Sequence, residues 1–275
     1  MKPQLTDYPG AVQVRDAATV MLVRDTDEGP EVFMLQRHLN SDFVGGAYVF
    51  PGGGVDTEDR HDDLELVCEG RTEAETSAEL RIESGGLAFW VAAVRECFEE
   101  AGVLLAYDAD GKVVDLSDPA IDERFQAHRA SVDSRERRLV EICEEESLVL
   151  ATDDIHYWSH WITPVGPPRR FDTRFFVAPA PAAQVAAHDN RETVDNLWVR
   201  PADALERHRL GKLEMIMPTI ANLEQIGRFD SVAELLDAAR QITDVPAILP
   251  KITIDAHGTP SALMPGDAGY DDLPA

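Results

Sequence analysis

A short run of charged residues, Arg-Glu-Cys-Phe-Glu-Glu-Ala-Gly, occupies positions 95–102. At about 100° per residue, a helix through this run gathers its charged side chains on one face and leaves the other face apolar. The charged set is Arg95, Glu96, Glu99 and Glu100, and the apolar set is Leu87, Trp90, Val91, Val94, Cys97, Phe98, Ala101 and Leu105. Glutamates three or four residues apart repel one another unless a cation lies among them, and Mg²⁺ is usually held by one or two carboxylates plus substrate phosphates. The charged face therefore indicates half of a metal site.

An ordinary solvated surface is the alternative for this face, because the chain has 51 acidic residues and amphipathic helices normally expose their charged side. The segment upstream favours a site. Residues 48–50, Tyr-Val-Phe, are typical of a strand, and they lead into Pro-Gly-Gly-Gly at 51–54, which we expect to form a turn. A backbone without side chains can approach a ligand or a metal closely.

Together, the glycine turn and the charged helix resemble the signature of the Nudix family, whose members hydrolyse a nucleoside diphosphate linked to another group. The signature runs G-x5-E-x7-R-E-U-x-E-E-x-G-U, where U is apolar. Its second half is matched in order by Arg95, Glu96, Cys97, Glu99, Glu100, Gly102 and Val103. Gly53 matches the opening glycine, but Asp59 stands in place of the first glutamate. In addition, 35 residues separate Asp59 from Arg95, where the family pattern has seven.

One branch of the family carries a long insertion at this point, and the chain resembles that branch, the coenzyme A diphosphatases of mammalian peroxisomes. The likeness runs in the same order from about residue 17 to the tail. It is carried by residues 49–53, 95–96, 98–105, 161–164 and 170–176. The resemblance implies hydrolase activity and a Nudix-type α/β/α sandwich, in which a mixed sheet lies between helices.

The resemblance also implies roles for individual residues. The carboxylates of Glu96, Glu99 and Glu100 would bind Mg²⁺ or Mn²⁺. The backbone carbonyl of Gly53 would complete the ligand set, and Arg95 would orient a neighbouring glutamate.

A further glutamate, Glu192, precedes the strand-like segment that ends at Trp198 and Val199. By its spacing to Trp198 it matches a family glutamate that completes the metal site or acts as the general base. An exposed loop acid is the alternative. Whether Glu192 or a glutamate of the charged helix is the base stays open.

Three arginines are candidates for binding substrate. Arg37 follows a strand in the segment before the glycine turn, where a solvated strand end is the alternative. Arg170 and Arg174 belong, with Arg169, to the densest positive cluster of the chain. A guanidinium suits phosphate, but ion pairs with nearby acids would explain the cluster equally well.

The leading substrate is coenzyme A or an acyl derivative, cleaved to adenosine 3′,5′-bisphosphate and 4′-phosphopantetheine or its acyl form. ADP-ribose and NADH are alternatives within the hydrolase class. A Nudix-fold module that binds a nucleotide without cleaving it is an alternative from a different class.

Composition limits the partners. A net charge of −26 argues against a nucleic acid or an anionic membrane, which require clustered Lys and Arg. The cysteines Cys68, Cys97 and Cys143 are too few and too widely spaced for a disulfide framework or a zinc site. No apolar stretch or leader indicates a membrane span or secretion, and the last residues are not of the Ser-Lys-Leu type. We expect a cytoplasmic protein, and a homodimer stays open.

We expect one α/β domain at residues 1–200, with insertions at about 60–86 and 107–150, and a helical extension at 201–275 packed on it. Strands are expected at 17–24 and 31–36, buried on both faces, and at 155–162, 174–178 and 192–199. The first insertion should be a surface excursion with one short helix. Helices are expected at 119–131, 134–148, 202–210 and within 219–241.

Three details complete these expectations. Ser134 should cap the helix at 134–148, and Asp230-Ser231 the last helix. His156 and His160 should share one strand face as hydrogen-bonded surface residues. Residues 248–263 should form a hairpin that turns at 257–260, and the chain beyond Pro265 should be a loose end.

Overall fold

The computed structural model describes residues 12–39, 45–61, 63–189, 191–254 and 260–273. Its strands are β1 (Val14–Thr26), β2 (Gly29–Arg37), β3 (Tyr48–Val49), β4 (Gly52–Gly54), β5 (Ala106–Tyr107), β6 (Val149–Leu150), β7 (His156–Ile162), β8 (Arg170–Pro179), β9 (Thr193–Val199), β10 (Ala247–Ile248), β11 (Lys251–Ile254) and β12 (Pro260–Leu263). Its α-helices are α1 (Glu73–Leu80), α2 (Leu87–Glu96), α3 (Pro119–Asp133), α4 (Leu139–Glu146), α5 (Pro201–Arg209), α6 (Met217–Ile226) and α7 (Val232–Arg240).

The main sheet is mixed, as expected. Its strand order is β10-β7-β8-β1-β2-β3, with β4 also paired to β1 and β9 to β2. β1 runs parallel to β8 along ten residue pairs, whereas its other edge pairs antiparallel, first with β4 and then with β2. The glycine run is therefore the short edge strand β4 and not the turn that the sequence indicated. Lacking side chains, it lies close against β1: a Cβ on Gly52 would fall 2.6 Å from the carbonyl oxygen of Ala18.

Burial on both faces of the first hairpin is confirmed. In β1, Val20 and Leu22 belong to one apolar cluster, and the intervening Met21 and Val23 belong to a second cluster on the other face. Successive side chains of a strand point to opposite faces, so a continuous apolar run supplies both cores at once.

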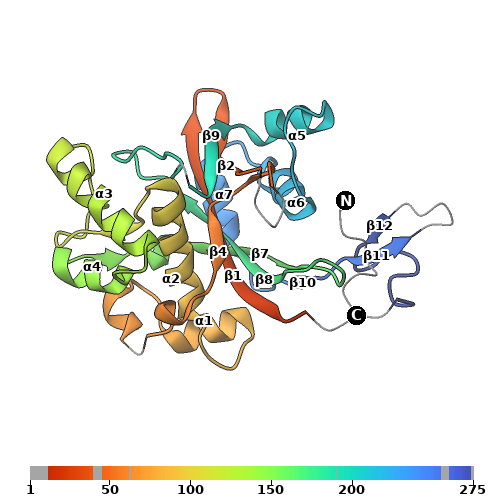
Figure 1. The fold of residues 1–275 in the computed structure, drawn as a ribbon, viewed down its shortest axis with the longest axis horizontal. Coiled ribbons are helices and arrows are strands. Elements are labelled where there is room, and N and C mark those ends of the chain that lie inside the picture. Colours follow the sequence, from red (N-terminus) through yellow and green to blue (C-terminus); the bar gives the residue numbers. More distant parts are fainter. Residues whose placement is uncertain (1–11, 40–44, 62, 190, 255–259, 274–275) are drawn as a thin grey trace.

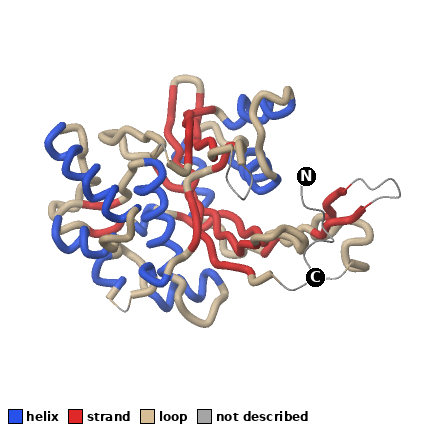
Figure 2. The backbone as a smooth tube through the Cα atoms, in the orientation of Figure 1, coloured by secondary structure: helices blue, strands red, loops and turns tan. Residues whose placement is uncertain are grey.

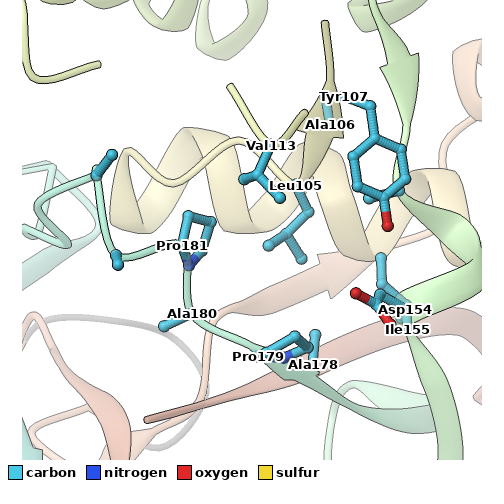
Figure 3. A pocket seen from close by; sticks show the side chains of 13 residues that line it. Leu105, Ala106, Tyr107, Val113, Asp154, Ile155, Ala178, Pro179, Ala180 and Pro181 are labelled. Atoms are coloured by element: carbon cyan, nitrogen blue, oxygen red, sulfur yellow. The ribbon is translucent and has the colours of Figure 1, made fainter. Parts of the chain in front are cut away.

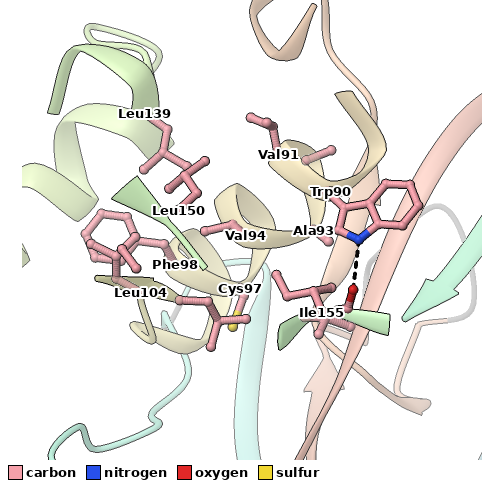
Figure 4. Packing of buried hydrophobic residues seen from close by; sticks show 14 of the residues in the cluster. Trp90, Val91, Ala93, Val94, Cys97, Phe98, Leu104, Leu139, Leu150 and Ile155 are labelled. Atoms are coloured by element: carbon pink, nitrogen blue, oxygen red, sulfur yellow. Dashed lines mark hydrogen bonds between the residues drawn. The ribbon is translucent and has the colours of Figure 1, made fainter. Parts of the chain in front are cut away.

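Helices cover both faces of the sheet (Figures 1 and 2). Helices α1–α4 lie on one side with the first cluster, and α5–α7 carry the second cluster on the other side. Figure 4 shows the first cluster around α2, where Trp90 is fully buried and donates its indole N–H to the carbonyl oxygen of Ile155 at 2.9 Å. In the described ranges, no helix has both the length and the apolar character that crossing a bilayer requires.

The first insertion is more than a surface excursion. It contains α1, the expected short helix, but its side chains Leu64, Val67, Cys68 and Leu80 are buried in the first cluster. These apolar residues are too sparse to show a helical period in the sequence, yet each reaches the core. The expectation of a surface excursion was therefore wrong, whereas that of one short helix is confirmed.

Three other expectations need correction. Ser134 closes α3 at its C-terminal end, and α4 begins only at Leu139, although the buried face expected for this helix is present. The chain beyond Pro265 is not a loose end, because it is hydrogen-bonded to β11 and to the residues just before it. Lys251 donates to the carbonyl oxygen of Leu273 at 2.7 Å, and the Tyr270 hydroxyl donates to that of Leu249 at 2.7 Å. The hairpin itself is confirmed as β11 and β12, while residues 255–259, which include most of its expected turn, lie outside the described residues.

His156 and His160 are both buried and face opposite sides of the sheet, contrary to expectation. A bulge between Tyr157 and Ser159 shifts the register of β7 against β8 and reverses the alternation of side chains. His156 pairs across the strands with Val177 of the second cluster, whereas His160 pairs with Arg174 on the first face and bonds to Asp172. A bulge of this kind leaves no clear mark in the sequence.

Candidate active site

Helix α2 and the turn that follows it carry the glutamates. Residues 97–101 form a single π-helical turn at the end of α2, and the chain leaves it at Gly102 with φ +68°. A side chain at this position would be strained, and its Cβ would fall 2.7 Å from Nη1 of Arg129. π-Helical turns inside α-helices are frequent at functional sites.

The first insertion caps the start of the same helix. Glu73 in α1 accepts hydrogen bonds from the backbone N–H groups of Gly85, Gly86 and Leu87, at 2.5, 3.2 and 3.0 Å. These are donors that the first turn of a helix leaves without partners. Although partial burial opposes the effect, the hydrogen bond from Ser77 and those from the backbone lower the pKa of Glu73. The inserted segment therefore supports the helix that it separates from the glycine strand.

The glycine strand lies directly against the glutamates despite the insertion. A Cβ on Gly53 would fall 2.5 Å from Oε1 of Glu96, so only glycine leaves room for this carboxylate. The neighbouring Gly52 donates its N–H to Oε2 of Glu100 at 2.9 Å. The two halves of the signature are thus in contact.

Arg95 fastens this contact. The residue is 7% exposed, and its side chain forms a two-pronged bond to Asp59, from Nε to Oδ1 and from Nη2 to Oδ2, both at 2.8 Å. Nη2 also donates to the carbonyl oxygen of Gly54 at 2.7 Å, and Nη1 to Glu96 at 2.8 Å. Asp59, the residue that departs from the signature, is therefore the buried partner of Arg95.

Burial raises the pKa values of all three glutamates. The pKa of Glu96 rises to about 8 through burial, with the nearby Arg95 opposing the shift and Glu99 adding to it. The pKa of Glu99 is also raised, chiefly by burial. That of Glu100 rises well above its ordinary value because of burial and the proximity of Glu96. Such a group of buried carboxylates favours a cation among them.

The donor set fits a hard divalent cation in its chemistry, since Glu96 and Glu99 offer carboxylate oxygens beside a backbone without side chains. Both carboxylates bond to Nη1 of Arg95, which lies 2.8 Å from Oε1 of Glu96 and 3.3 Å from Oε2 of Glu99. Of the described His, Cys, Asp and Glu residues, a group of three with ligand atoms within 4.8 Å of one another occurs only at His128, Glu145 and Glu146. There, Arg124 and Arg137 already pair with the two glutamates.

A cleft of about 840 Å³ opens above these residues, a size within the usual range for small-molecule sites. Six of the residues singled out in the sequence line it: Arg37, Gly53, Arg95, Glu96, Glu99 and Glu192. Glu192 is exposed, and its carbonyl oxygen accepts from the N–H of His38 at 3.0 Å. Arg37 and Glu192 both influence the pKa of Glu100, so the three charged groups are neighbours.

Three other candidates do not line the cleft. Glu100 is 4% exposed and lies behind the glycine strand. Arg174 is buried, bonds to Asp172 and has its guanidinium 5.0 Å from the centre of the Phe89 ring, which belongs to the first cluster. Arg170 donates from Nε to the carbonyl oxygen of Thr163 at 3.0 Å. Ion pairing with nearby acids, the alternative considered for this cluster, describes the contact of Arg174 with Asp172, whereas Arg170 bonds to the backbone.

The cleft also contains residues that sequence reasoning missed. Its walls include the aromatic Trp161, Phe171 and Phe175, the arginines Arg15, Arg135 and Arg169, and Ile252 and Ala262 from the hairpin. Arg169 could have been found from the arginine cluster to which it belongs. Ile252 and Ala262 could not, because they come from a segment that the sequence suggested only as a hairpin.

A second, smaller cavity of about 370 Å³ lies elsewhere and is mostly apolar (Figure 3). Its walls include Leu105, Val113 and Pro181, and its lining contains none of the signature residues. The signature carboxylates Glu96 and Glu99 line the larger cleft instead.

Comparison with known proteins decides the family. The model described as the NUDT19 Nudix domain matches residues 71–226, more than half of the chain. The chain belongs to the Nudix hydrolase family. The match begins after the glycine strand, and β4 is joined to the matched segment by the contacts of Gly54 with Arg95 and of Gly53 with Glu96.

The relatives of this Nudix hydrolase include proteins named acyl-coenzyme A diphosphatase NUDT19. That of Xenopus laevis is 28% identical over 89% of this chain and 72% of its own length. Those of Gallus gallus and Homo sapiens are each 29% identical, over 100% and 88% of this chain and 82% and 73% of their own lengths. A Nudix hydrolase structure from Alicyclobacillus acidocaldarius has the same fold, with a TM-score of 0.68 and 23% identity over 83% of this chain and 97% of that one.

Proposed function

We propose that this Nudix hydrolase cleaves the diphosphate bond of coenzyme A or acyl-coenzyme A in a reaction that depends on Mg²⁺ or Mn²⁺. The products would be adenosine 3′,5′-bisphosphate and 4′-phosphopantetheine or its acyl form. The observation that carries the hydrolytic part is the carboxylate of Glu96 held against the backbone of Gly53 on the floor of the cleft. The names of the relatives support the substrate.

Glu96 and Glu99 would hold the cation, with the Gly53 carbonyl completing the set and Glu100 behind it. When bound, a divalent cation would neutralise diphosphate charge and polarise the attacking water. Arg95 keeps Glu96 oriented through the bond from Nη1, and its own position is fixed by Asp59 and Gly54.

Two carboxylates are candidates to accept the proton of the attacking water. Glu99 and Glu192 both line the cleft; Glu99 lies in the π-helical turn after α2, and Glu192 directly precedes β9. A base must lie within hydrogen-bond reach of the water it activates. Comparing Glu99→Gln with Glu192→Gln assigns the base, because only the loss of the base abolishes the rise of kcat with pH.

The activity is tested with purified protein and Mg²⁺ or Mn²⁺. Coenzyme A, acetyl-coenzyme A, ADP-ribose and NADH are supplied separately, and products are followed by chromatography. We expect adenosine 3′,5′-bisphosphate from the first two substrates and a loss of at least about a hundredfold in kcat for Glu99→Gln. Glu206→Gln, which changes an exposed glutamate in α5, serves as the matched control.

Each other outcome has a clear meaning. Faster turnover of ADP-ribose or NADH would show that the protein is a hydrolase whose preferred substrate is not coenzyme A. Tight binding without turnover of any of the four would identify a nucleotide-binding module instead.

A further inference from the structure

Arg129 of α3, in the second insertion, contacts the π-helical turn at the end of α2. Arg129 donates from Nε to the carbonyl oxygen of Glu99 at 2.9 Å and from Nη2 to that of Glu100 at 3.0 Å. The two carbonyl groups lie in the last turn, where backbone carbonyls have no hydrogen-bond partner within the helix. The insertion is therefore docked on the site, and the last turn of α3 is held beside the glutamates: Asp133 lines the cleft and is close enough to raise the pKa of Glu99.

The chain leaves α3 through an unusual residue. Arg135 has φ +59°, and the bonds from its N–H to Val132 and from the N–H of Glu136 to Ser131 form the closing pattern in which this position is usually glycine. A side chain in the left-handed region costs free energy that glycine would avoid. Residues held in such conformations are concentrated at functional sites.

The side chain of Arg135 reaches Asp56, just after the glycine strand. Its Nη2 lies 2.8 Å from Oδ2 of Asp56, and the same oxygen lies 3.9 Å from Nη2 of Arg95. Nη2 of Arg135 and Nη2 of Arg95 are therefore close to each other, on either side of one oxygen of Asp56. Arg95 is the arginine that contacts Glu96 and Glu99. Arg135 lines the cleft and its side chain is 71% exposed, so an anion in the cleft can reach it.

We propose that Arg135 is a substrate-binding residue that contacts the diphosphate in the cleft. The inference rests on the proposed function for the identity of the substrate, but it concerns a group that every candidate substrate shares. An arginine can bind two oxygens of a phosphate at once, and an exposed ion pair with Asp56 is weak enough to be exchanged for that contact. The 107–150 insertion thus supplies part of the substrate site.

The chain contains a matched control at the end of α1. Arg81 also has a positive φ, of 56°, and its N–H and that of Ile82 close the helix in the same pattern. Its side chain is 64% exposed and pairs with Asp244 at 2.8 Å, outside the lining of the cleft. Arg81→Gly and Arg135→Gly each remove a strained backbone conformation and one exposed ion pair. The two positions differ in that only Arg135 lines the cleft.

The test compares Arg135→Gly with Arg81→Gly, using coenzyme A and dephospho-coenzyme A. We expect both variants to unfold at or above the temperature of the parent. Only Arg135→Gly should lose kcat/KM, by about ten- to a hundredfold, because a charge-assisted bond to substrate is removed. The loss should be the same for both substrates and should be partly restored in Arg135→Lys, which retains a positive charge.

Three results would overturn the inference. One is an Arg135→Gly variant as active as the parent, and another is an equal loss in Arg81→Gly. The third is a loss confined to coenzyme A, since dephospho-coenzyme A lacks the 3′-phosphate and the contact would then be with that group. If the parent cleaves neither substrate, the proposed function fails, and binding of ADP by calorimetry still decides whether Arg135→Gly weakens contact with a diphosphate.

Discussion

Asp59 stands where the signature has a glutamate, and it is the buried partner of Arg95. It is 2% exposed and its carboxylate receives two hydrogen bonds from Arg95, so a buried charge is balanced by a buried charge. Such pairs are costly to break from one side, because the remaining ion stays buried without its partner.

Replacing Asp59 by alanine should therefore lower the free energy of unfolding by about 3 kcal/mol. Urea unfolding followed by fluorescence measures this loss. Asp63→Ala, in the first insertion, is the control, since Asp63 is exposed and pairs only loosely with His61 at 3.8 Å. It should change stability by less than about 1 kcal/mol. Equal effects in the two variants would contradict the role assigned to Asp59.

Gly53 tests the contact between the two halves of the signature. A methyl group there would meet the Glu96 carboxylate at 2.5 Å, whereas one on Gly54 would meet only the carbonyl oxygen of Asp16 at 3.9 Å. Gly53→Ala should lower kcat at least about tenfold because a displacement of an ångström at a reacting group is costly. Gly54→Ala should retain activity. Steady-state kinetics of the two variants compares them directly.

At the scale of elements, α2 and the π-helical turn after it are bound at both ends by the two insertions that flank them. Glu73 of the first insertion caps the beginning of α2, and Arg129 of the second binds carbonyls of the π-helical turn. A helix end is ordinarily closed by neighbouring residues in the chain. Here residues of the insertions bind at both ends.

The cap by Glu73 gives a pH dependence of stability. The folded protein lowers the pKa of Glu73 below that of the unfolded chain, so the carboxylate stabilises the fold above the unfolded pKa of about 4.5 and this contribution is lost as the pH falls through the folded value. Glu73→Gln should cost about 1 kcal/mol at pH 7 and progressively less as the pH falls below 4.5. Urea unfolding at pH 7 and at lower pH measures the difference. Glu79→Gln, which changes a glutamate of α1 that pairs with Arg71, is the control at pH 7.

For the whole molecule, the first insertion is part of the folded core. Leu80 of α1 is buried in the cluster around α2, whereas Leu66 in the same insertion is 78% exposed. Leu80→Ala should lower the free energy of unfolding by about 2–4 kcal/mol through lost contacts and a cavity, and Leu66→Ala by less than about 1 kcal/mol. Two cooperative transitions in the Leu80→Ala variant, with α1 lost first, would show instead that the insertion is a separate unit.

Local period and spacing were enough to predict several elements from the sequence. The charged and apolar faces of α2, the strands of the first hairpin and the cap at Ser231 are all local patterns, and all are present. The contact of Gly53 with Glu96 was expected from family resemblance. Pairing of Asp59 with Arg95 and the reach of Arg135 into the cleft depend on chain segments that meet only in the folded state, so no local pattern marks them.

Errors arose where a tertiary contact outweighed a local pattern. The spacing of His156 and His160 suggested one face, but a bulge turns them apart. Ser134 is a good cap by type but closes α3, because α4 starts at Leu139 where the apolar residues reach the core. The arginine cluster at 169–174 is divided by the sheet, which leaves Arg169 in the cleft and buries Arg174 against Phe89.

The participation of the hairpin in the cleft has a consequence for synthesis of the protein. The cleft is lined at once by Val14 of β1 and by Ala262 of β12, which pairs with Ile252. A ribosome synthesises β1 long before β12. The wall formed by the hairpin is therefore the last part of the cleft to be made, and the cleft is complete only when the hairpin has folded against it.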